Sequence, residues 1–421
     1  MTSIIDTPRI DHDAADSGPE RQSDRVYHDL LSPAEVRDVR LRVRDIARRG
    51  IAPLAGRIAQ GDERLDGFPR DAFDVLATGG VFRVPFGTDV GGDGLRNPAG
   101  ATAAAVEEIA YYSNSVAAIF DVHCILAGNA VNQGTVEQRR RWLAPVVSGE
   151  VVGAFATSEP GASSDLSPAA VQTAARRTGH GWVLTGRKRW ITNSVVAGFV
   201  VVLARTGDRL STFIVPMDAP GVTVGVADRK LGNRGQITAD ITFDDVELGD
   251  EALLGPEGGG LEIALQTLTY GRIGIAAAGV GMAQSAFDHT VAHLRARRAF
   301  GAPLGAKQHW QFLMADRATE IAVARDLYVK AALRLDSGVA FPEPEAAMAK
   351  LRGSEIAVQM GRDAVQAFGG FGFVAHLGAD DSSSPVEAIY RDSKIGEIYE
   401  GANEVQRWVL ARRIFGRETT G

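Results

Sequence analysis

Residues 151–165 read VVGAFATSEPGASSD, and the texture of the sequence changes at this stretch. Upstream of it, from about Leu31 to Gly149, apolar residues recur at the spacing of helices. Downstream, short apolar runs are broken by glycine, proline and aspartate, a pattern typical of strands joined by turns. Helical spacing returns after residues 255–260 and continues to the end of the chain. The order along the chain is therefore helices, then a sheet, then helices again.

This order predicts an α+β protein with three folded parts, as expected for 421 residues at about 150 residues per domain. The first 25 residues are polar and acidic, and residues 1–25 are predicted to be a disordered tail. The predicted domains are a helical domain at 26–150, a small antiparallel barrel or sandwich at 151–256 and a second helical domain at 257–421. Helices are expected over 71–78, 100–119, 123–133, 135–148, 261–298, 307–337, 343–368 and 403–415, and strands over 151–157, 169–176, 181–185, 199–204, 211–215, 222–226 and 237–243.

The composition argues against several classes of protein. The 45 basic and 52 acidic residues give a formal charge of −7, which argues against a general nucleic-acid binder. A single cysteine, Cys124 in the apolar run DVHCILAG, excludes an intramolecular disulfide and multi-cysteine metal sites, and is predicted to be a core residue. The longest apolar runs noted, 195–204 and 273–283, are about half the ~20 residues that a membrane helix needs. With no signal-peptide core in the tail, the expectation is a cytoplasmic protein without a membrane partner.

Several familiar catalytic motifs are missing. No GxGxxG follows a strand and no GxxxxGK[ST] occurs, so the fingerprints of dinucleotide-binding Rossmann folds and P-loops are absent. There is also no GxSxG nucleophile elbow. His289 and His293 are four residues apart on an expected helix, but no carboxylate signature accompanies them. They are interpreted as histidines of a solvated helix face, and no metal is predicted.

Two segments in the β-region carry groups suited to a flat ligand. The end of the stretch at 151–165 is rich in hydroxyls and exposed backbone amides, which can bind a heterocycle or a phosphate or can form only a β-turn. In GRKRWITN, residues 186–193, Trp190 and Thr192 lie two apart and therefore share one face of a strand. The indole can cover a ring while the hydroxyl bonds its edge, although a core tryptophan would show the same pattern.

Three further segments lie in the second helical region. RRAFGAPLGAKQ, residues 297–308, combines arginine, an aromatic residue and a glycine turn, which suits a pyrophosphate clamp or a plain surface loop. In QAFGGFGF, residues 366–373, the glycines permit close approach of a ligand to the backbone. In IYEGANEVQR, residues 398–407, Glu400 precedes a helix start among apolar neighbours. It is a candidate base, or else a solvated acid favoured by the helix dipole.

Taken together, the motifs AxSEPGAxSD, KRWITN, RxxFG…Q, QxFGGxGF and IYEG resemble the acyl-CoA dehydrogenase family in order and spacing, from about Ser32 to Gly416. The resemblance implies an N-terminal helical domain, a central antiparallel β-barrel and a C-terminal four-helix bundle. It also implies non-covalent FAD, a homotetramer, an acyl-CoA or other acyl thioester substrate and an electron-transfer flavoprotein that accepts the electrons.

The resemblance also assigns roles to individual residues. Ser164 and Arg272 match substrate-binding positions. The positions that match contacts to FAD within one subunit are Phe155, Thr157, Ser158, Trp190, Ile191 and Thr192, with Ala402, Asn403 and Glu404 in the loop after the base. Those that match contacts to the FAD of a neighbouring subunit are Arg297, Phe300, Gln308, Gln366, Gly369 and Gly370.

Glu400 matches the catalytic base of the commoner subgroup of this family. A second subgroup carries its glutamate at the position of Gly271, which cannot take a proton, so Glu400 is the one candidate. By this resemblance, Glu400 removes the α-proton of an acyl thioester while a β-hydride passes to the flavin, which gives a trans-2-enoyl thioester. Burial of the carboxyl beside the flavin and the acyl chain is expected to raise its pKa.

Three departures from the family pattern keep an alternative open. Ser163 stands where glycine is usual, Ala402 replaces a frequent threonine, and the polar run at 374–384 is longer than expected. That run is either an exposed loop or a feature that shapes access for an unusual carrier. The alternative function is a flavoenzyme of the same fold with a different carrier or chemistry: an acyl-carrier-protein dehydrogenase, a desulfinase or a flavin monooxygenase. A third possibility is a catalytically idle relative, against which the retained base and motifs argue.

Overall fold

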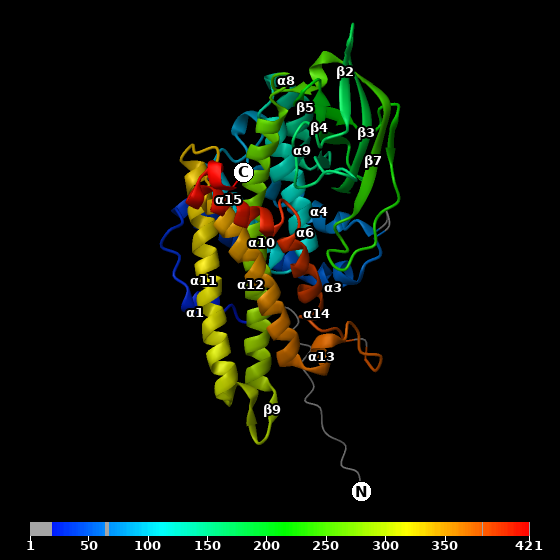
Figure 1. The fold of residues 1–421 in the computed structure, drawn as a ribbon. Helices are drawn as coiled ribbons and strands as arrows, with labels where there is room; N and C mark the ends of the chain where they lie inside the picture. Colours follow the sequence, from blue (N-terminus) through cyan, green and yellow to red (C-terminus); the bar gives the residue numbers. More distant parts are fainter. Residues whose placement is uncertain (1–18, 64–66, 381, 421) are drawn as a thin grey trace.

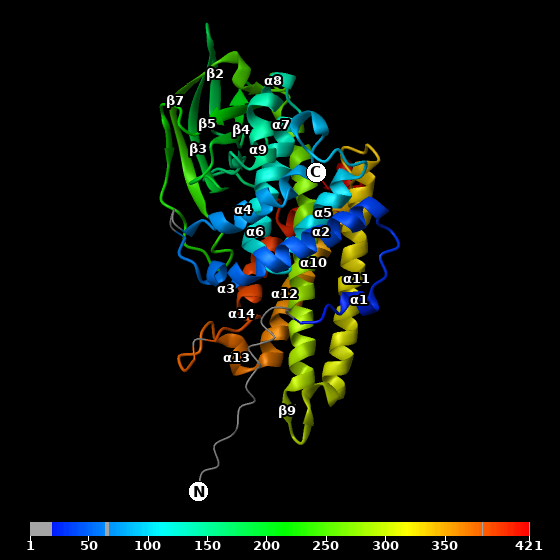
Figure 2. The same cartoon turned by 180° about the vertical axis from the view of Figure 1, so that it is seen from behind.

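The computed structural model describes residues 19–63, 67–380 and 382–420 (Figure 1). A β-sheet lies beside one end of a bundle of long helices, and the N-terminal helices cross the bundle and reach the sheet (Figures 1 and 2). Residues from all three regions can therefore meet where the sheet, the bundle and the N-terminal helices adjoin.

The N-terminal region is built from short helices. They are α1 (Ser23–Val26), α2 (Ala34–Gly50), α3 (Ala52–Gln60), α4 (Arg70–Thr78), α5 (Pro98–Ala110), α6 (Asn114–Phe120), α7 (Asn129–Asn132), α8 (Val136–Gln138) and α9 (Ala144–Ser148), with 3₁₀ turns η3 (Val81–Arg83) and η4 (Thr88–Val90) and π-helical segments η5 (Asp121–Gly128) and η6 (Arg139–Leu143). The expected helix over 100–119 is divided, because the chain leaves helical geometry at Ser113, whose hydroxyl caps α6 by accepting from the N–H of Val116.

In the described residues, eight strands form one mixed sheet in the order β6-β7-β3-β2-β4-β5-β8, with β1 paired to β4. They are β1 (Gly153–Ala156), β2 (Ala174–Thr178), β3 (Gly181–Thr192), β4 (Phe199–Thr206), β5 (Arg209–Pro216), β6 (Val222–Val224), β7 (Thr238–Leu248) and β8 (Leu253–Leu254), with 3₁₀ turn η7 (Asp250–Ala252). The sheet is not purely antiparallel as predicted, since β1 and β2 both run parallel to β4. β3 is longer than expected and carries the KRWIT motif inside the strand.

Three long helices form the second helical region: α10 (Gly260–Ala296), α11 (Gln308–Asp336) and α12 (Glu345–Phe368). A small hairpin of β9 (Arg298–Ala299) and β10 (Ala302–Pro303), with η8 (Leu304–Ala306), joins α10 to α11. Shorter helices complete the region: α13 (Gly370–Phe373), α14 (Glu387–Ser393), η9 (Lys394–Glu397), α15 (Asn403–Phe415) and α16 (Arg417–Thr420).

Helices α10 and α12 approach each other through glycine. A Cβ atom on Gly279 would lie 2.2 Å from the carbonyl oxygen of Gly353, and one on Gly353 would lie 2.6 Å from the carbonyl oxygen of Ala276. Both contacts are with backbone, which cannot move aside as a flexible side chain can. The crossing therefore requires glycine on both helices.

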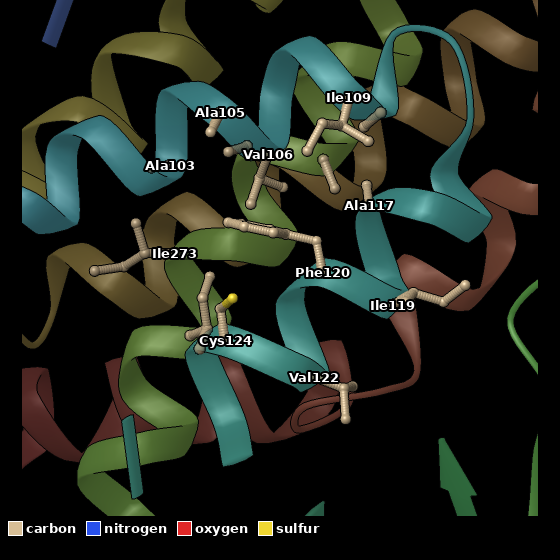
Figure 3. Packing of buried hydrophobic residues seen from close by; sticks show 14 of the residues in the cluster. Ala103, Ala105, Val106, Ile109, Ala117, Ile119, Phe120, Val122, Cys124 and Ile273 are labelled. Atoms are coloured by element: carbon tan, nitrogen blue, oxygen red, sulfur yellow. The ribbon is translucent and has the colours of Figure 1, made fainter. Parts of the chain in front are cut away.

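The N-terminal helices pack on α10 through a shared apolar core. Figure 3 shows the ring of Phe120 beside Val106 of α5, with Cys124 and Ile273 of α10 in the same cluster. All four side chains are buried, which confirms the prediction for Cys124. Because η5 is packed on both α10 and β1, its position is set by the bundle and by the sheet together.

The prediction of a disordered tail over 1–25 is wrong for its last residues, while residues 1–18 lie outside the described residues. Arg21 pairs with the buried Glu108 at 3.0 Å and lies 3.3 Å from the centre of the Tyr111 ring. The backbone N–H of Gln22 donates to Asp288 at 3.1 Å. These contacts dock a polar segment that hydropathy alone identifies as solvated, because the buried acids supply its partners.

One stretch, Asn114–Asn132, is long and apolar enough by composition to cross a membrane. In the structure 94% of its apolar window is buried inside the protein, so it serves here as a core segment. The sequence analysis did not single out this stretch, because Asp121 and His123 interrupt its apolar run.

The α10–α12 crossing yields a test of packing. We expect Gly353→Ala to lower the free energy of unfolding by about 1–3 kcal/mol, because the added methyl group forces the backbones apart. Gly56→Ala is the matched control, since a Cβ on Gly56 of α3 meets nothing within 4 Å and alanine favours helix. Thermal unfolding of the two variants measures the difference. If the unfolding midpoint of Gly353→Ala is equal to or higher than that of Gly56→Ala, the close backbone contact between α10 and α12 is contradicted.

Candidate active site

Glu400 lies in the loop between η9 and α15, in a backbone conformation that few non-glycine residues adopt. Its φ is +52°, and Gly401 follows at φ +90°. The side chain of Gln406 holds the turn, because its Nε2 donates to the carbonyl of Gly401 at 2.8 Å. Strain of this kind, held in place by neighbouring groups, is typical of functional sites. Here it turns the Glu400 side chain inward, toward α10.

The carboxyl of Glu400 rests against α10 at Gly271. A Cβ on Gly271 would lie 1.8 Å from Oε2 of Glu400 and 2.9 Å from a methyl carbon of Leu126. Oε2 is shielded from solvent and accepts no hydrogen bond from the groups that the structure describes. The sequence indicated that Gly271 cannot act as a base, and the structure adds that only glycine leaves room for the carboxyl of Glu400.

Two cations lie close to this carboxyl. Arg272 donates from Nη1 to Glu343 at 2.7 Å, and its Nε lies 3.9 Å from the place of a Cβ on Gly401. Lys350 of α12 is buried and donates from Nζ to the side chain of Asn403 at 2.9 Å. Burial raises the pKa of Glu400, and the attraction of Lys350 and Arg272 opposes that rise. Burial likewise lowers the pKa of Lys350 to about 8.

Asp121, at the start of η5, is a residue that the sequence analysis missed. It is only 1% exposed, and neither of its carboxyl oxygens has a hydrogen-bond partner among donors in the described ranges. Burial and the neighbouring Glu400 raise the pKa of Asp121 well above its ordinary value. The available signal was one acid inside the apolar run AAIFDVHCILAG.

At the end of the sheet, a bulge in β3 exposes Trp190. The register with β7 shifts between Lys188 and Ile191, and Trp190 takes a φ of +57°. Its side chain is 59% exposed, whereas Ile191 beside it is buried. Asp240 on β7 holds the bulge by accepting from the N–H of Trp190 at 3.3 Å. The sheet thus presents an open indole face instead of burying it.

A buried ion pair, also missed from sequence, ties this bulge to the end of β1. Lys188 lies 2.8 Å from Glu159 and donates to the carbonyl of Thr157 at 3.1 Å. Ser158 accepts from the N–H of Arg189 at 2.9 Å. The SEPG turn and the RKRW segment are therefore one rigid unit, which explains why charged residues occur in both.

The other predicted site residues differ in their surroundings. Phe155 on β1 is buried, Ser164 is exposed on its loop, and the hydroxyl of Thr192 accepts from Gln236. Asn403 is buried against Ser354, while Glu404 is exposed and Ala402 sits at the start of α15. The structure brings Glu400 together with Arg272, but their predicted ligand contacts stay predictions.

The remaining predicted contacts lie far from Glu400 within one chain. Arg297 follows Gly271 by about 26 residues along α10, which corresponds to roughly 40 Å. Phe300, in the hairpin, is 96% exposed. The segment at 366–370 lies at the same end of the bundle as the hairpin, because the ring of Phe368 stacks on the ring of His293 with their centres 4.1 Å apart. Figure 1 shows β9 and α13 at the end of the bundle remote from the sheet. The members of this remote group are Arg297, Phe300, Gln308, Gln366, Gly369 and Gly370.

The two histidines of α10 are not on a solvated face as predicted. His293 is half-buried under Phe368, and burial lowers the pKa of His289 to about 4. Within the described ranges, no group of three metal-ligating side chains gathers. The polar run at 374–384 forms a loop between α13 and α14 and is mostly exposed where it is described; residue 381 lies outside the described residues.

Family models cover nearly the whole chain. The N-terminal, middle and C-terminal domains of acyl-CoA dehydrogenase match residues 33–150, 154–246 and 258–415. The chain belongs to the acyl-CoA dehydrogenase family. This confirms the resemblance and the predicted fold class, and these three ranges follow the order helices, sheet, helices.

Relatives match this chain over more than nine tenths of its length. The mitochondrial short-chain specific acyl-CoA dehydrogenase of Bos taurus is 39% identical over 400 residues, which are 94% of this chain and 93% of that protein. Among solved structures, butyryl-CoA dehydrogenase of Megasphaera elsdenii has a TM-score of 0.84 at 32% identity, covering 92% of this chain and all of that one. A glutaryl-CoA dehydrogenase of Mycobacterium smegmatis in complex with FADH2 has a TM-score of 0.84 at 26% identity. That match covers 93% of this chain and 97% of the other.

A further solved chain comes from a structure described as an electron transferring flavoprotein of Acidaminococcus fermentans. It has a TM-score of 0.85 at 33% identity and covers 92% of this chain and all of that one. The protein is thus an oxidoreductase, an FAD-dependent acyl-CoA dehydrogenase. The donor set suits the cofactor, because the open face of Trp190 beside the Thr192 hydroxyl can cover a flat ring and bond its edge.

The contact between Gly271 and Glu400 yields a second prediction. We expect Gly271→Ala to leave folding and FAD binding nearly unchanged, because the new methyl group meets only the ends of two side chains, the carboxyl of Glu400 and a methyl carbon of Leu126. The displaced carboxyl then slows reduction of the flavin by an acyl-CoA about 100-fold, the order expected when a general base is misplaced. Anaerobic stopped-flow bleaching measures the rate and thermal unfolding the stability; unchanged bleaching would contradict this geometry.

Proposed function

We propose that this enzyme desaturates a short-chain acyl-CoA between the α and β carbons, with Glu400 as the base. The observation that supports the role of Glu400 is its place: a shielded carboxyl oxygen against Gly271, with Arg272 and Lys350 at its sides. A carboxyl whose pKa is raised by burial is a better acceptor for the weakly acidic α-proton.

The residues of this chain would divide the chemistry as follows. Glu400 takes the α-proton, and its backbone N–H, which has no backbone acceptor in the described part of the chain, is available to the thioester oxygen. Such a donor stabilises the negative charge that develops on that oxygen. FAD, when bound, supplies the electron acceptor for the β-hydrogen. Trp190 and Thr192, fixed by the bulge in β3, would hold its ring in place.

The short acyl chain is supported by what surrounds the carboxyl. Leu126 and Ile125 of η5 lie against α10 at Gly271 and Gly274. Side chains so close to the base leave little depth for a long acyl tail. The names of the Bos taurus and Megasphaera elsdenii relatives point to the same class of substrate.

We also propose that FAD contacts come from two subunits of a homotetramer. The hairpin with Phe300 and the segment at 366–370 lie too far from Glu400 to serve the same active site. The exposed aromatic side chains of Phe300 in the hairpin and of Phe373, three residues beyond the segment at 366–370, suit burial against a second copy. An electron-transfer flavoprotein is the proposed electron acceptor, and the name of the similar Acidaminococcus fermentans structure supports this proposal. The cytoplasm is the proposed location.

The role of Glu400 yields a direct test. We expect Glu400→Gln to retain FAD and to bind butyryl-CoA, because glutamine keeps the size and polarity of the side chain. Reduction of the flavin by butyryl-CoA should fall about 10²–10⁴-fold, since the amide cannot take the α-proton. Anaerobic bleaching of the flavin absorbance measures the rate.

The matched control is Glu137→Gln, because Glu137 on α8 is an exposed glutamate that belongs to none of the predicted site segments. Near-normal bleaching in Glu400→Gln would remove Glu400 from its role. Octanoyl-CoA and palmitoyl-CoA in the same assay check the chain length, and faster bleaching by either than by butyryl-CoA would overturn the short-chain assignment.

The shared cofactor site yields a prediction on assembly. Light scattering should give about four times the 44.7 kDa of one chain. We expect Phe300→Asp to lower the FAD retained per chain and the mass, because the charge disrupts the contact with a second subunit. Val136→Asp, at another exposed apolar position, is the control. A monomeric protein with full FAD would refute the two-subunit site.

A further inference from the structure

Two carboxyl groups lie over one stripe of α10. Gly271 and Gly274 are three residues apart, so their outward positions are neighbours on the helix surface, about 5–6 Å apart. A Cβ on Gly271 would meet Oε2 of Glu400 at 1.8 Å, and one on Gly274 would meet Oδ1 of Asp121 at 2.1 Å. The two side chains approach within hydrogen-bonding range of each other. The glycines thus form a shallow recess that holds both acids.

No protein donor in the described residues satisfies this pair. Neither oxygen of Asp121 accepts a hydrogen bond from such a donor, nor does Oε2 of Glu400, although all three atoms are buried. Two adjacent carboxylates that are shielded from water repel each other and cannot both ionise at neutral pH. One proton held between them removes the repulsion and supplies the missing donor.

The surrounding charges decide which acid holds the proton. The positive charges of Lys350 and Arg272 lower the pKa of Glu400 and favour its ionised form. For Asp121, burial and the negative charge of Glu400 both raise the pKa. The titratable and charged groups around the pair in the described residues are Cys124 on η5, Tyr270 and Arg272 on α10, Glu343, which pairs with Arg272, Lys350 on α12, and Glu397, Tyr399 and Glu404 around the Glu400 loop. The nearby cations therefore favour Glu400 as the anion and Asp121 as the neutral acid.

We propose that Asp121 is a positioning residue for the base: it stays protonated and donates a hydrogen bond to the Glu400 carboxylate. This inference rests on the proposed role of Glu400. The hydrogen bond fixes the orientation of the carboxylate and stabilises its ionised form. Asp121 keeps its own proton throughout, while Glu400 takes the α-proton of the substrate. The π-helical geometry of η5, common at functional sites, contributes to the placement of Asp121 at Gly274.

Two substitutions of Asp121 distinguish a role as hydrogen-bond donor from a role in packing alone. The acidic limb of the pH profile of kcat/KM reports ionisation of the free base. Asp121→Leu keeps the shape but removes the donor, so the pKa of Glu400 rises and the limb moves to higher pH. A shift of about one unit lowers the rate on the acid side about tenfold. Asp121→Asn restores a donor through its amide, so its limb should stay close to that of the wild type.

The matched control is Asp288→Asn. Asp288 is a buried acid on the same helix, 14 residues or about 20 Å beyond Gly274, and it bonds Tyr111 and Gln284 instead. This variant should leave the acidic limb in place. A limb that moves equally in Asp121→Leu and Asp121→Asn, or in neither, overturns the proposal.

A second readout does not depend on turnover. The infrared spectrum of the wild-type holoenzyme at neutral pH should contain a C=O band of a protonated carboxylic acid that Asp121→Asn removes. Absence of that band overturns the proposal even if Asp121→Leu does not fold. The two hypotheses are contradicted by different results. Normal flavin bleaching in Glu400→Gln contradicts the role of Glu400 as the base. If Glu400→Gln loses bleaching but the acidic limb of the kcat/KM profile does not move in the Asp121 variants, only the role of Asp121 is contradicted.

Discussion

Helix α10 approaches its neighbours more closely than side chains allow, and the active site depends on that closeness. Its glycines face the carbonyl of Gly353 on α12, the carbonyl of Glu107 on α5 and the carboxyls of Asp121 and Glu400. At each of these positions a Cβ atom would lie between 1.8 and 2.3 Å from the nearest of these atoms. The stripe of glycines therefore sets both the packing of the bundle and the room available to the base.

Charge is handled differently in the two halves of the site. At the sheet, Lys188 and Glu159 neutralise each other, and burial without one partner would be costly. At α10, two acids meet with cations on one side only, so the local field is uneven. The first arrangement fixes the end of β1 and the bulge that exposes Trp190. The second holds a carboxylate in a state suited to accept a proton.

In the proposed two-subunit arrangement, one chain supplies only part of each FAD site. Residues of the hairpin after α10 and of the turn after α12 share one end of the bundle, joined by the stacking of His293 on Phe368. The length of α10 separates them from Glu400, as Figure 1 shows for β9 and α15. A helix of this length can carry one cofactor contact at each end only if the two contacts serve different copies of the active site.

The sequence by itself determined the order of helices and strands and the family, and it singled out Glu400 as the candidate base, because these depend on local periodicity and on motifs whose residues are neighbours in the chain. It also located α10, α11, α12 and α15 to within a few residues, but not the shorter helices α13, α14 and α16. What only the tertiary structure decided were contacts between distant segments: Asp121 beside Glu400, Lys188 under the SEPG turn, the parallel pairing of β1 with β4, and the docking of residues 19–25. A buried acid and a solvated one look alike in a sequence, since burial and the approach of a partner arise only when the chain is packed.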